Sequence, residues 1–339
     1  MKFQVVVCMA AIVALPPFAT PTVAQHARTL TLDGWVGAVA FSPNGKFLAT
    51  GSSDNLARLW DVATGKELVS FRGHRDYVAA VAFSPDSKTL ATGSYDHTAR
   101  LWDLSSGKTR AELRGHRGGV MAVAFSPEGQ MLATGSIDGD VKLWDAASGK
   151  LIKTLSGHKS WVNSLAFQPA GKLLASGSSD GTIGLWPLTD AEPKPSFLRA
   201  TKAEVRCVAF SQGGKHLAAG LRYGKIKIWD AESRKELREI AGHEDDVWSM
   251  AFLPDDKGLV AGDGGWGRSG QVKLWQVATG RCTATFQHSG EVLSLAVSPN
   301  GQWLALPFDS DKAPCCTLLH LPTGDTVQLP TSNEARFVG

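Results

Sequence analysis

The sequence predicts an all-β protein, a seven-bladed β-propeller of four-stranded antiparallel blades. Three observations predict this fold. A tryptophan recurs at a nearly constant step, an Ala-Phe pair recurs with the same step, and turn dipeptides such as Asn-Gly and Ser-Gly separate short runs of strand-forming residues. A period of about 40 residues that holds four short strands is typical of one propeller blade. At 339 residues, 43% of them hydrophobic, the chain can bury a large core.

The tryptophans that close each repeated phrase set the number of blades. They stand at Trp60, Trp102, Trp144, Trp186, Trp229 and Trp275. A further phrase, which has lost its tryptophan, ends at His320. We therefore expect seven units that together span residues 29–330.

The elements of one blade can be read from the unit that begins at Val78. VAAVAFSP is the first strand, TLATGS the second, TARLWD the third and TRAEL the fourth, with turn residues between them. In the first strand Ala82 and its equivalents each follow a large residue such as Val81, so one face of the strand is small and the other is large. This alternation suits the innermost strand, because the blades converge at the axis.

Two segments compete for the outer place in the last blade. Residues 29–32 (TLTL) stand where the other units carry a fourth strand, and residues 325–329 (DTVQL) follow the third strand of the last unit. We expect the N-terminal segment to take this place, because a blade built from both ends of the chain closes the ring without leaving unpaired backbone groups.

Residues 1–24 have the pattern of a secretory signal peptide. Lys2 precedes an apolar run from Phe3 to Leu15, prolines follow, and we expect cleavage after Ala24. A membrane anchor is the alternative, but this run is shorter than the roughly 20 apolar residues that span a bilayer. We therefore expect a periplasmic or secreted protein with no membrane span in its mature form, and a C-terminal tail at residues 331–339.

Composition limits the classes of partner and cofactor that we expect the protein to bind. A formal net charge of +3 gives no strong basic field, so we expect no nucleic-acid partner. Cys207, Cys282, Cys315 and Cys316 remain after the expected cleavage, and we interpret them as free, buried thiols. None of them has the spacing of zinc ligands. We expect a monomer without a metal or cofactor.

The chain resembles the WD-repeat (Trp-Asp repeat) β-propeller proteins, in an exported bacterial form. Gly-His, a second-strand Thr or Ser, a turn Asp and the Trp carry the resemblance, because all four occur at fixed offsets. In that family the His, Thr or Ser, Asp and Trp side chains form a hydrogen-bonded tetrad that ties the loop leading into a blade to its central turn. The implied tetrads are His74, Thr92, Asp96 and Trp102; His116, Thr134, Asp138 and Trp144; and His158, Ser176, Asp180 and Trp186.

The other units depart from this pattern. The first has Thr50, Asp54 and Trp60 without Gly-His. The fifth has Ala219 and Tyr223 where the hydroxyl residue and the Asp belong. In the sixth, the insertion GDGGWGRSG separates the His from the Trp, and the seventh has no Trp. These units are either relaxed or specialised.

The Asp-His-Ser/Thr grouping also suggests a catalytic triad, but we interpret it as structural. A triad needs an exposed nucleophile on a strained turn beside an oxyanion hole. Here the hydroxyl lies in the middle of a strand, a tryptophan covers the other end, and the set occurs three times. We therefore predict that the protein is not an enzyme.

Residues at the rim of the disc are the candidate binding residues. Aromatic or apolar side chains precede the first strand or the turn Asp in the first four units, at Trp35, Tyr77, Tyr95, Ile137 and Trp161. Acidic residues take the first of these positions in the last three units, at Glu204, Asp246 and Glu291. An exposed aromatic cluster indicates a protein contact. The alternative is that these side chains only pack across the loops.

Three functional classes follow. The favoured one is an exported, non-catalytic interaction scaffold that binds a protein or peptide through the propeller rim. A carbohydrate-binding module is the second, with Trp35, Trp161 and Trp266 as platforms. A propeller enzyme of hydrolase type is the third, but it would need polar or metal-binding residues at the axis, where this sequence has alanines.

Overall fold

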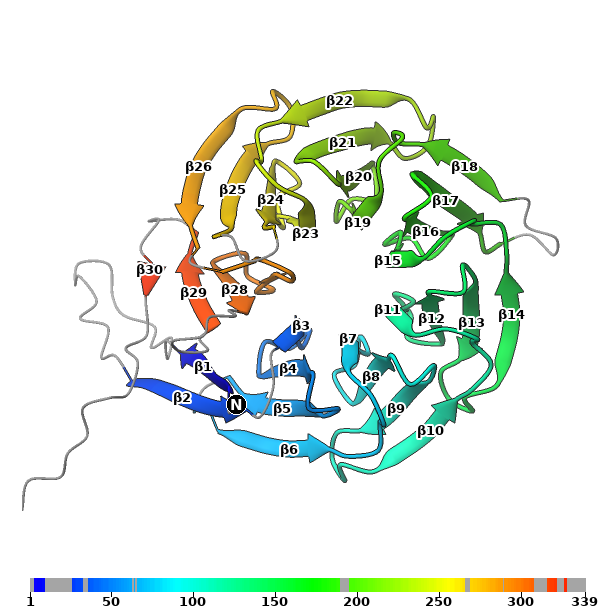
Figure 1. Ribbon diagram of the computed structural model, residues 1–339, viewed down its shortest axis with the longest axis vertical. Coiled ribbons are helices and arrows are strands. Elements are labelled where there is room, and N and C mark those ends of the chain that lie inside the picture. The colour runs from blue at the N-terminus through cyan, green and yellow to red at the C-terminus, as the bar shows by residue number, and fades with distance from the viewer. Residues whose placement is uncertain are drawn as a thin grey trace, which may run out of the picture.

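The computed structural model describes residues 3–9, 26–32, 36–62, 64, 66–189, 195–265, 269–288, 290–307, 316–321 and 326–327. The regular elements of these residues are strands, arranged as antiparallel sheets around a central axis (Figure 1). Over these same ranges, the chain has no helix of the length and apolar character needed to cross a membrane.

Six sheets are regular four-stranded blades, each with its first strand innermost (Figure 1). Blade one is β3 (Val36–Phe41), β4 (Phe47–Ser52), β5 (Ala57–Asp61) and β6 (Glu67–Phe71). Blade two is β7 (Val78–Phe83), β8 (Thr89–Ser94), β9 (Ala99–Asp103) and β10 (Thr109–Leu113). Blade three is β11 (Val120–Phe125), β12 (Met131–Ser136), β13 (Val141–Asp145) and β14 (Leu151–Leu155).

The next three blades follow the same order. Blade four is β15 (Val162–Phe167), β16 (Leu173–Ser178), β17 (Thr182–Pro187) and β18 (Ser196–Arg199). Blade five is β19 (Val205–Phe210), β20 (His216–Leu221), β21 (Lys225–Asp230) and β22 (Glu236–Ala241). Blade six is β23 (Val247–Phe252), β24 (Gly258–Asp263), β25 (Gln271–Gln276) and β26 (Cys282–Gln287).

The seventh repeat forms only a reduced sheet. Its strands are β27 (Ala296–Val297), β28 (Trp303–Pro307), β29 (Cys316–His320) and β30 (Thr326–Val327), and the first and last have two residues each. The all-β propeller with four-stranded antiparallel blades is confirmed, but the prediction of seven blades is wrong, because six regular blades are formed. Pro307 stands in register where the regular blades have a glycine, and Leu319, not His320, occupies the tryptophan position opposite Leu304. A proline has no amide hydrogen for the ladder and a leucine has no indole to donate, so the repeat lacks two features that the regular blades share.

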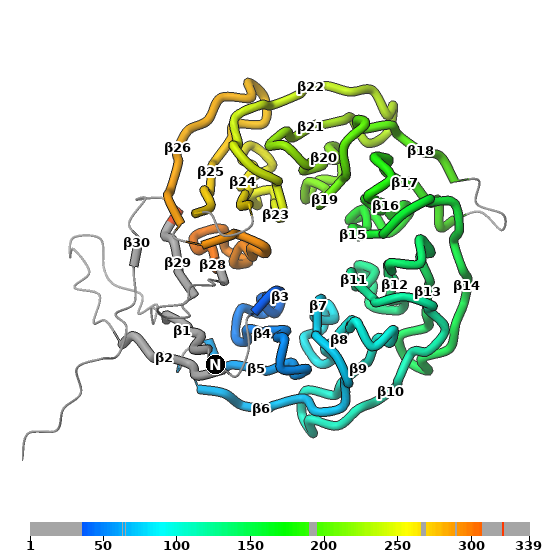
Figure 2. The backbone as a smooth tube through the Cα atoms, viewed as in Figure 1, coloured from blue at the N-terminus to red at the C-terminus, as the bar shows by residue number. Residues whose placement is uncertain are grey.

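The reduced sheet still meets blade one. The Ser294 hydroxyl accepts a hydrogen bond from the Val39 amide at 3.3 Å, across the two ends of the repeat array. Ser249 likewise accepts a bond from the Leu295 amide at 2.9 Å, and so joins blade six to the seventh repeat. Figure 2 shows β28 between blade six and β3. The ring is therefore closed by contacts on both sides of the reduced sheet.

The predicted closing strand is wrong. Val327 of β30 pairs with Leu318 of β29, so the C-terminal segment takes the outer place. Leu30 pairs instead with Val5, because β2 (His26–Leu32) forms a hairpin with β1 (Phe3–Met9) that lies beside β29. A nearby strand loses less chain entropy on pairing than one from the far end of the chain. The expected tail at residues 331–339 lies outside the described residues.

In blades one, two, three and five, the aspartate after the tryptophan explains the turn between the third and fourth strands. Asp103 Oδ1 accepts bonds from the Ser106 amide and hydroxyl, both at 2.8 Å. Gly107 follows with φ +68°, a left-handed conformation that favours glycine. The Trp-Asp pair thus combines a core residue with a residue that caps the turn.

A glycine in the second strand lets neighbouring blades approach. A Cβ built on Gly135 would lie 2.6 Å from Cγ1 of Val162, the first residue of the next blade. Gly93 has the same relation to Val120, at 2.8 Å. This contact recurs around blades one to six, so the glycine of the repeated TGS or SGS phrase is fixed by packing between blades.

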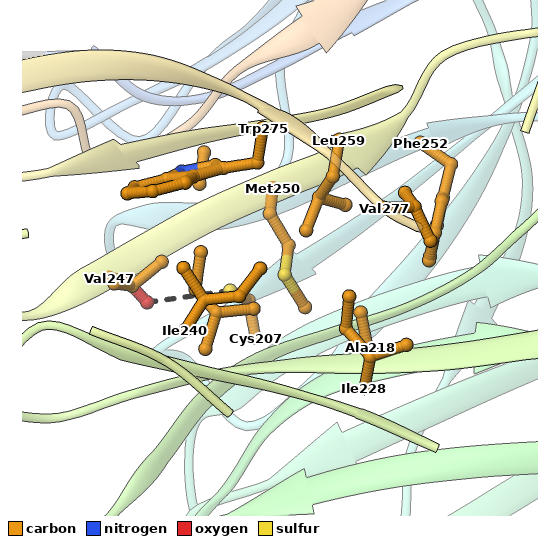
Figure 3. Packing of buried hydrophobic residues seen from close by; sticks show 12 residues of the cluster. Cys207, Ala218, Ile228, Ile240, Val247, Met250, Phe252, Leu259, Trp275 and Val277 are labelled. Carbon is orange, nitrogen blue, oxygen red and sulfur yellow. Dashed lines mark hydrogen bonds between the residues drawn. The ribbon is translucent and has the colours of Figure 1, made fainter. Parts of the chain in front are cut away.

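The core lies between the blades. Figure 3 shows one cluster, in which Trp275 and Met250 of blade six pack near Ile228 of blade five. Cys207 is buried in the same cluster, and burial raises the pKa of its thiol to about 12. Cys207 and Cys282 are free, as predicted, although Cys282 is only half-buried. Cys315 lies outside the described residues, as does the side chain of Cys316.

We predict that Gly135→Ala lowers the free energy of unfolding by about 1–3 kcal/mol, because the added methyl group overpacks the contact with Val162. Urea unfolding of the variant measures this. In the Val162→Ala variant, where the neighbouring side chain is smaller, Gly135→Ala should lower the free energy of unfolding by less than it does in the unsubstituted protein. If the two substitutions are simply additive, the packing explanation is wrong.

Candidate functional site

The loops that lead into the innermost strands and the turns between the second and third strands lie on one face of the disc, which we call the loop face. The two kinds of loop meet there in blades two to six. In blade two the Tyr95 amide donates to the Tyr77 carbonyl at 3.0 Å, and in blade four the Ser179 amide donates to the Trp161 carbonyl at 2.9 Å. Side chains from consecutive blades therefore share one surface.

The predicted tetrad in blade two is a continuous chain of hydrogen bonds. The Trp102 indole donates to the Thr92 hydroxyl at 2.9 Å, and that hydroxyl lies 2.6 Å from His74 Nε2. His74 Nδ1 lies 2.9 Å from Asp96 Oδ2. Because a carboxylate only accepts, Nδ1 carries the proton and Nε2 accepts from Thr92. Asp96 also accepts from the Arg75 amide, which fixes the loop leading into the blade.

Blades three and four repeat this geometry. His116 Nε2 lies 2.7 Å from the Thr134 hydroxyl, and the Trp144 indole donates to that hydroxyl at 2.9 Å. His116 Nδ1 is 3.1 Å from Asp138. In blade four the distances are 2.7 Å for His158 to Ser176, 2.8 Å for Trp186 to Ser176 and 3.0 Å for His158 to Asp180.

Blade one replaces the missing histidine with an arginine. The Trp60 indole donates to the Thr50 hydroxyl at 3.0 Å, as in the complete tetrads. Asp54, which has no histidine to bind, accepts a hydrogen bond from the buried Arg58 at 2.5 Å. The turn carboxylate is thus neutralised from the third strand of the same blade.

Blade six rebuilds the network from a residue that the repeat pattern did not predict. Ala261 occupies the hydroxyl position, and the Trp275 indole lies 3.4 Å from His243 Nε2, to which it donates directly. His243 Nδ1 binds Asp263 at 2.9 Å, and Asp263 stands where blades one to four have the last serine of the second strand. The sequence did contain a signal for this network, because Asp263 stands two residues before the position that the turn aspartate has in the complete tetrads.

The tetrads cannot act as hydrolytic triads. The Thr92 hydroxyl is buried and already accepts the indole hydrogen bond, so no substrate can reach it. Thr134 and Ser176 are buried in the same way. The networks stabilise the blades, as the resemblance implied.

Burial sets the protonation of the tetrads. It lowers the pKa of His116 and of His158 below the usual value, so both imidazoles are neutral near pH 7. Burial by itself would raise the pKa of Asp96, but hydrogen bonds from His74, Thr98 and the Arg75 amide outweigh it and hold that pKa well below its usual range. The pKa values of Asp138 and Asp180 are also lowered, so in blades three and four a neutral histidine is bound to an ionised aspartate.

The predicted rim residues of blades two and three pack partly against one another. The rings of Tyr77 and Tyr95 lie 5.5 Å apart, and both side chains are half-buried. Burial raises the pKa of Tyr77 well above its usual value. Ile137 is also half-buried, and a Cβ on the intervening Gly119 would touch both Ile137 and Tyr95. Packing across the loops therefore accounts for the aromatic and apolar character of these rim residues in blades two and three.

Two aromatic side chains on the loop face are exposed. Trp161 is 46% exposed, as the rim prediction required. Tyr223 is 69% exposed, in the turn of blade five where the tetrad aspartate would stand, with φ +68°. The sequence analysis noted Tyr223 only because it replaces the tetrad aspartate. Trp35, Trp266 and Arg268 lie outside the described residues.

The acidic rim of blades five and six is largely neutralised by arginines. Arg206 donates to Asp246 through Nε at 3.1 Å and Nη2 at 2.7 Å, and its Nη1 lies 2.7 Å from Glu204. Arg222 Nη1 donates to Glu204 at 2.8 Å. The Arg206 guanidinium also lies 4.2 Å from the Trp248 ring centre. Sequence spacing missed this network, because its members come from different blades.

Comparison with known proteins identifies the repeats. The family described as IFT122 first beta-propeller matches residues 93–313, and WD domain, G-beta repeat matches residues 25–61 and 65–103. Among curated proteins, the chain is 50% identical over 60 residues to a probable serine/threonine-protein kinase PkwA of Thermomonospora curvata. It is 53% identical over 45 residues to an uncharacterized WD repeat-containing protein of Nostoc sp., and 41% identical over 105 residues to a ribosome biogenesis protein BOP1 homolog of Caenorhabditis elegans.

These alignments are short. They cover 18%, 13% and 29% of this chain, and 8%, 3% and 15% of the three proteins, in the same order. The chain therefore matches only a small part of the length of these relatives, and the similarity concerns the repeats.

We predict that Trp102→Phe destabilises the protein more than Trp229→Phe does. The first substitution removes the indole bond to Thr92 and leaves a buried hydroxyl with one partner fewer, which costs about 1–3 kcal/mol. In blade five Ala219 stands at the hydroxyl position, so Trp229 has no such hydroxyl to bind and its replacement changes mainly packing. Denaturant unfolding of both variants measures the difference, and equal losses would contradict the proposed energetic role of the tetrad.

We predict that stability falls as the pH drops below about 6.5, the ordinary histidine pKa. His116 and His158 have lowered pKa values in the fold, so between the two values the unfolded chain binds more protons. A second loss should begin near pH 4, because Asp96 and Asp138 also have lowered pKa values. Melting temperatures from pH 8 to pH 3 measure both steps.

The control for the first step compares two histidine variants. His116→Asn should reduce the dependence between pH 7 and pH 5, whereas His97→Asn, at an exposed turn position, should leave it unchanged. A profile that stays flat between pH 7 and pH 5 in the unsubstituted protein would refute the linkage.

Proposed function

Because this chain belongs to the WD-repeat β-propellers, in the family described as IFT122 first beta-propeller, we propose that it is a non-catalytic scaffold that binds a protein or peptide on its loop face. The observation that carries this proposal is the pair of exposed aromatic side chains, Trp161 and Tyr223, on one face of a rigid ring. Aromatic anchors contribute a large share of binding energy at protein interfaces.

The rest of the architecture supports this use of the face. The tetrads of blades two to four hold the leading loops in place through Asp96 and its equivalents. We further propose that the reduced sheet acts as the seventh blade and keeps the ring closed, since Ser294 joins it to blade one. A closed ring presents its loops with little loss of entropy on binding.

We also propose that residues 1–24 direct the chain to the periplasm or out of the cell, and that the partner is found there. The apolar run after Lys2 and the small residues before Ala24 support this. Cleavage after Ala24 would remove β1 and free the paired edge of β2. The search for a partner therefore uses extracts of the cell envelope and of the medium.

A carbohydrate ligand is the second candidate, because an exposed tryptophan such as Trp161 can stack on a sugar ring. A glycan array probed with the purified protein separates the two. Retention on glycans that is lost in Trp161→Ala would favour the carbohydrate, and protein capture without glycan retention would favour the scaffold.

We predict that Trp161→Ala and Tyr223→Asn each reduce recovery of the partner at least tenfold in a pull-down, since loss of an anchor costs about 2–4 kcal/mol of binding. Asparagine is chosen at position 223 because it tolerates the positive φ. Both variants should melt close to the unsubstituted protein, because the two side chains are exposed.

Two controls accompany this test. Ile152→Ala removes an apolar side chain of similar exposure from the outer strand of blade three, and partner recovery should not change. Trp102→Ala should instead lower the melting temperature by opening a cavity in the core. Full recovery of the partner by both loop-face variants would show that binding lies elsewhere.

A further inference from the structure

We propose that the part of the loop face between Trp161 and Tyr223 binds an acidic peptide segment, in which a carboxylate is held by Arg222 and a neighbouring apolar side chain packs on the exposed aromatic rings. This inference rests on the proposed function and specifies its partner. It runs against the sequence pattern, which places acidic residues at this part of the rim.

Two of the acidic residues here, Glu204 and Asp246, are already paired. Both oxygens of Glu204 are bound, Oε1 by Arg222 at 2.8 Å and Oε2 by Arg206 at 2.7 Å. Asp246 Oδ2 accepts two bonds from Arg206, and Oδ1 accepts the Tyr223 amide at 3.0 Å. A cationic partner would have to displace these bonds, so Glu204 and Asp246 do not favour a basic peptide.

The two arginines differ in how many of their donors are used. Arg206 has all three guanidinium nitrogens engaged by the two carboxylates, and its side chain is 13% exposed. Arg222 donates one hydrogen bond, through Nη1, and its Nε lies 4.0 Å from Asp246, which is too long for a hydrogen bond. Within the described part of the chain, Nε and Nη2 of Arg222 are left to bind a ligand.

Arg222 is also accessible and held in place. Its side chain is 42% exposed, and its guanidinium lies 5.1 Å from the centre of the Tyr223 ring. Glu204 fixes one side of the guanidinium, so the remaining Nε and Nη2 pair keeps a defined direction. This pair matches the two oxygens of a carboxylate, which arginine binds in a bidentate manner.

A chain of contacts links this arginine to Trp161. The Ser179 amide binds the Trp161 carbonyl, and the Ser179 hydroxyl donates to Glu204 Oε2 at 3.3 Å. Glu204 in turn holds Arg222. Trp161 and Tyr223 therefore lie on neighbouring blades and are joined through one fixed polar cluster.

Fluorescence anisotropy with defined peptide pools tests this inference. Three labelled pools of octapeptides have random apolar and aromatic positions and differ only at two fixed central positions, which are Glu, Gln or Lys. The full chain should bind the Glu pool about tenfold more tightly than the Gln pool, and the Lys pool least. The preference for Glu should weaken as the salt concentration rises.

Two matched variants assign the effect. Arg222→Gln keeps a donor for Glu204 but removes the charge, so the preference for the Glu pool should disappear. Arg117→Gln removes the same charge from another loop-face arginine, which follows the tetrad histidine His116 of blade three and has an 82% exposed side chain. It should keep the preference. Melting temperatures check that both variants are folded.

Tighter binding of the Lys pool, equal binding of the Glu pool by Arg222→Gln, or no binding of any pool would each overturn the inference. The proposed function has its own test. If partner recovery depends on Trp161 and Tyr223 but not on Arg222, the loop face binds a partner of another charge; if it depends on none of the three, the loop face itself is the wrong surface.

Discussion

The chain of hydrogen bonds from indole to hydroxyl to imidazole to carboxylate is the interaction on which blades two to four depend. In blade two it runs from Trp102 through Thr92 and His74 to Asp96, and so joins the third strand, the second strand, the leading loop and the central turn. Each polar group in it is buried and has a partner, and such networks stabilise one arrangement because any alternative leaves a buried group unpaired. The loop positions at the surface are therefore set from the core.

The blades without a full tetrad show which part of this network is needed. Blade one keeps the indole-to-hydroxyl bond and uses Arg58 to neutralise Asp54. Blade six drops the hydroxyl and moves the carboxylate to Asp263. In both, a charged partner for the turn carboxylate or for the histidine is retained. The seventh repeat has neither the hydroxyl nor the indole position filled in this way, and its sheet is reduced.

The loop face has two chemically different halves because the blades differ. Where the tetrads are complete, the rim side chains such as Tyr77 and Tyr95 lie against each other and are half-buried. Where the tetrad is lost, in blade five, the turn presents Tyr223 and Arg222 outward, and Asp246 from the next loop caps the turn amide. Blade five, which has lost the tetrad, thus exposes an aromatic ring and a guanidinium side by side, which favours specialisation over decay.

The sequence by itself determined the strand order of the blades, the tetrads of blades two to four and the free cysteines Cys207 and Cys282. The strand order and the tetrads follow from local spacing, because residues at fixed offsets in one repeat meet within one blade. Only the tertiary structure decided the rest. Arg206 and Asp246 are 40 residues apart and meet because neighbouring blades lie side by side. The strand that pairs with the outer edge of β29 is β30, and β2, which was predicted there, pairs with β1. Contacts between blades depend on which elements are neighbours in the ring, and a repeat pattern records only contacts within one unit.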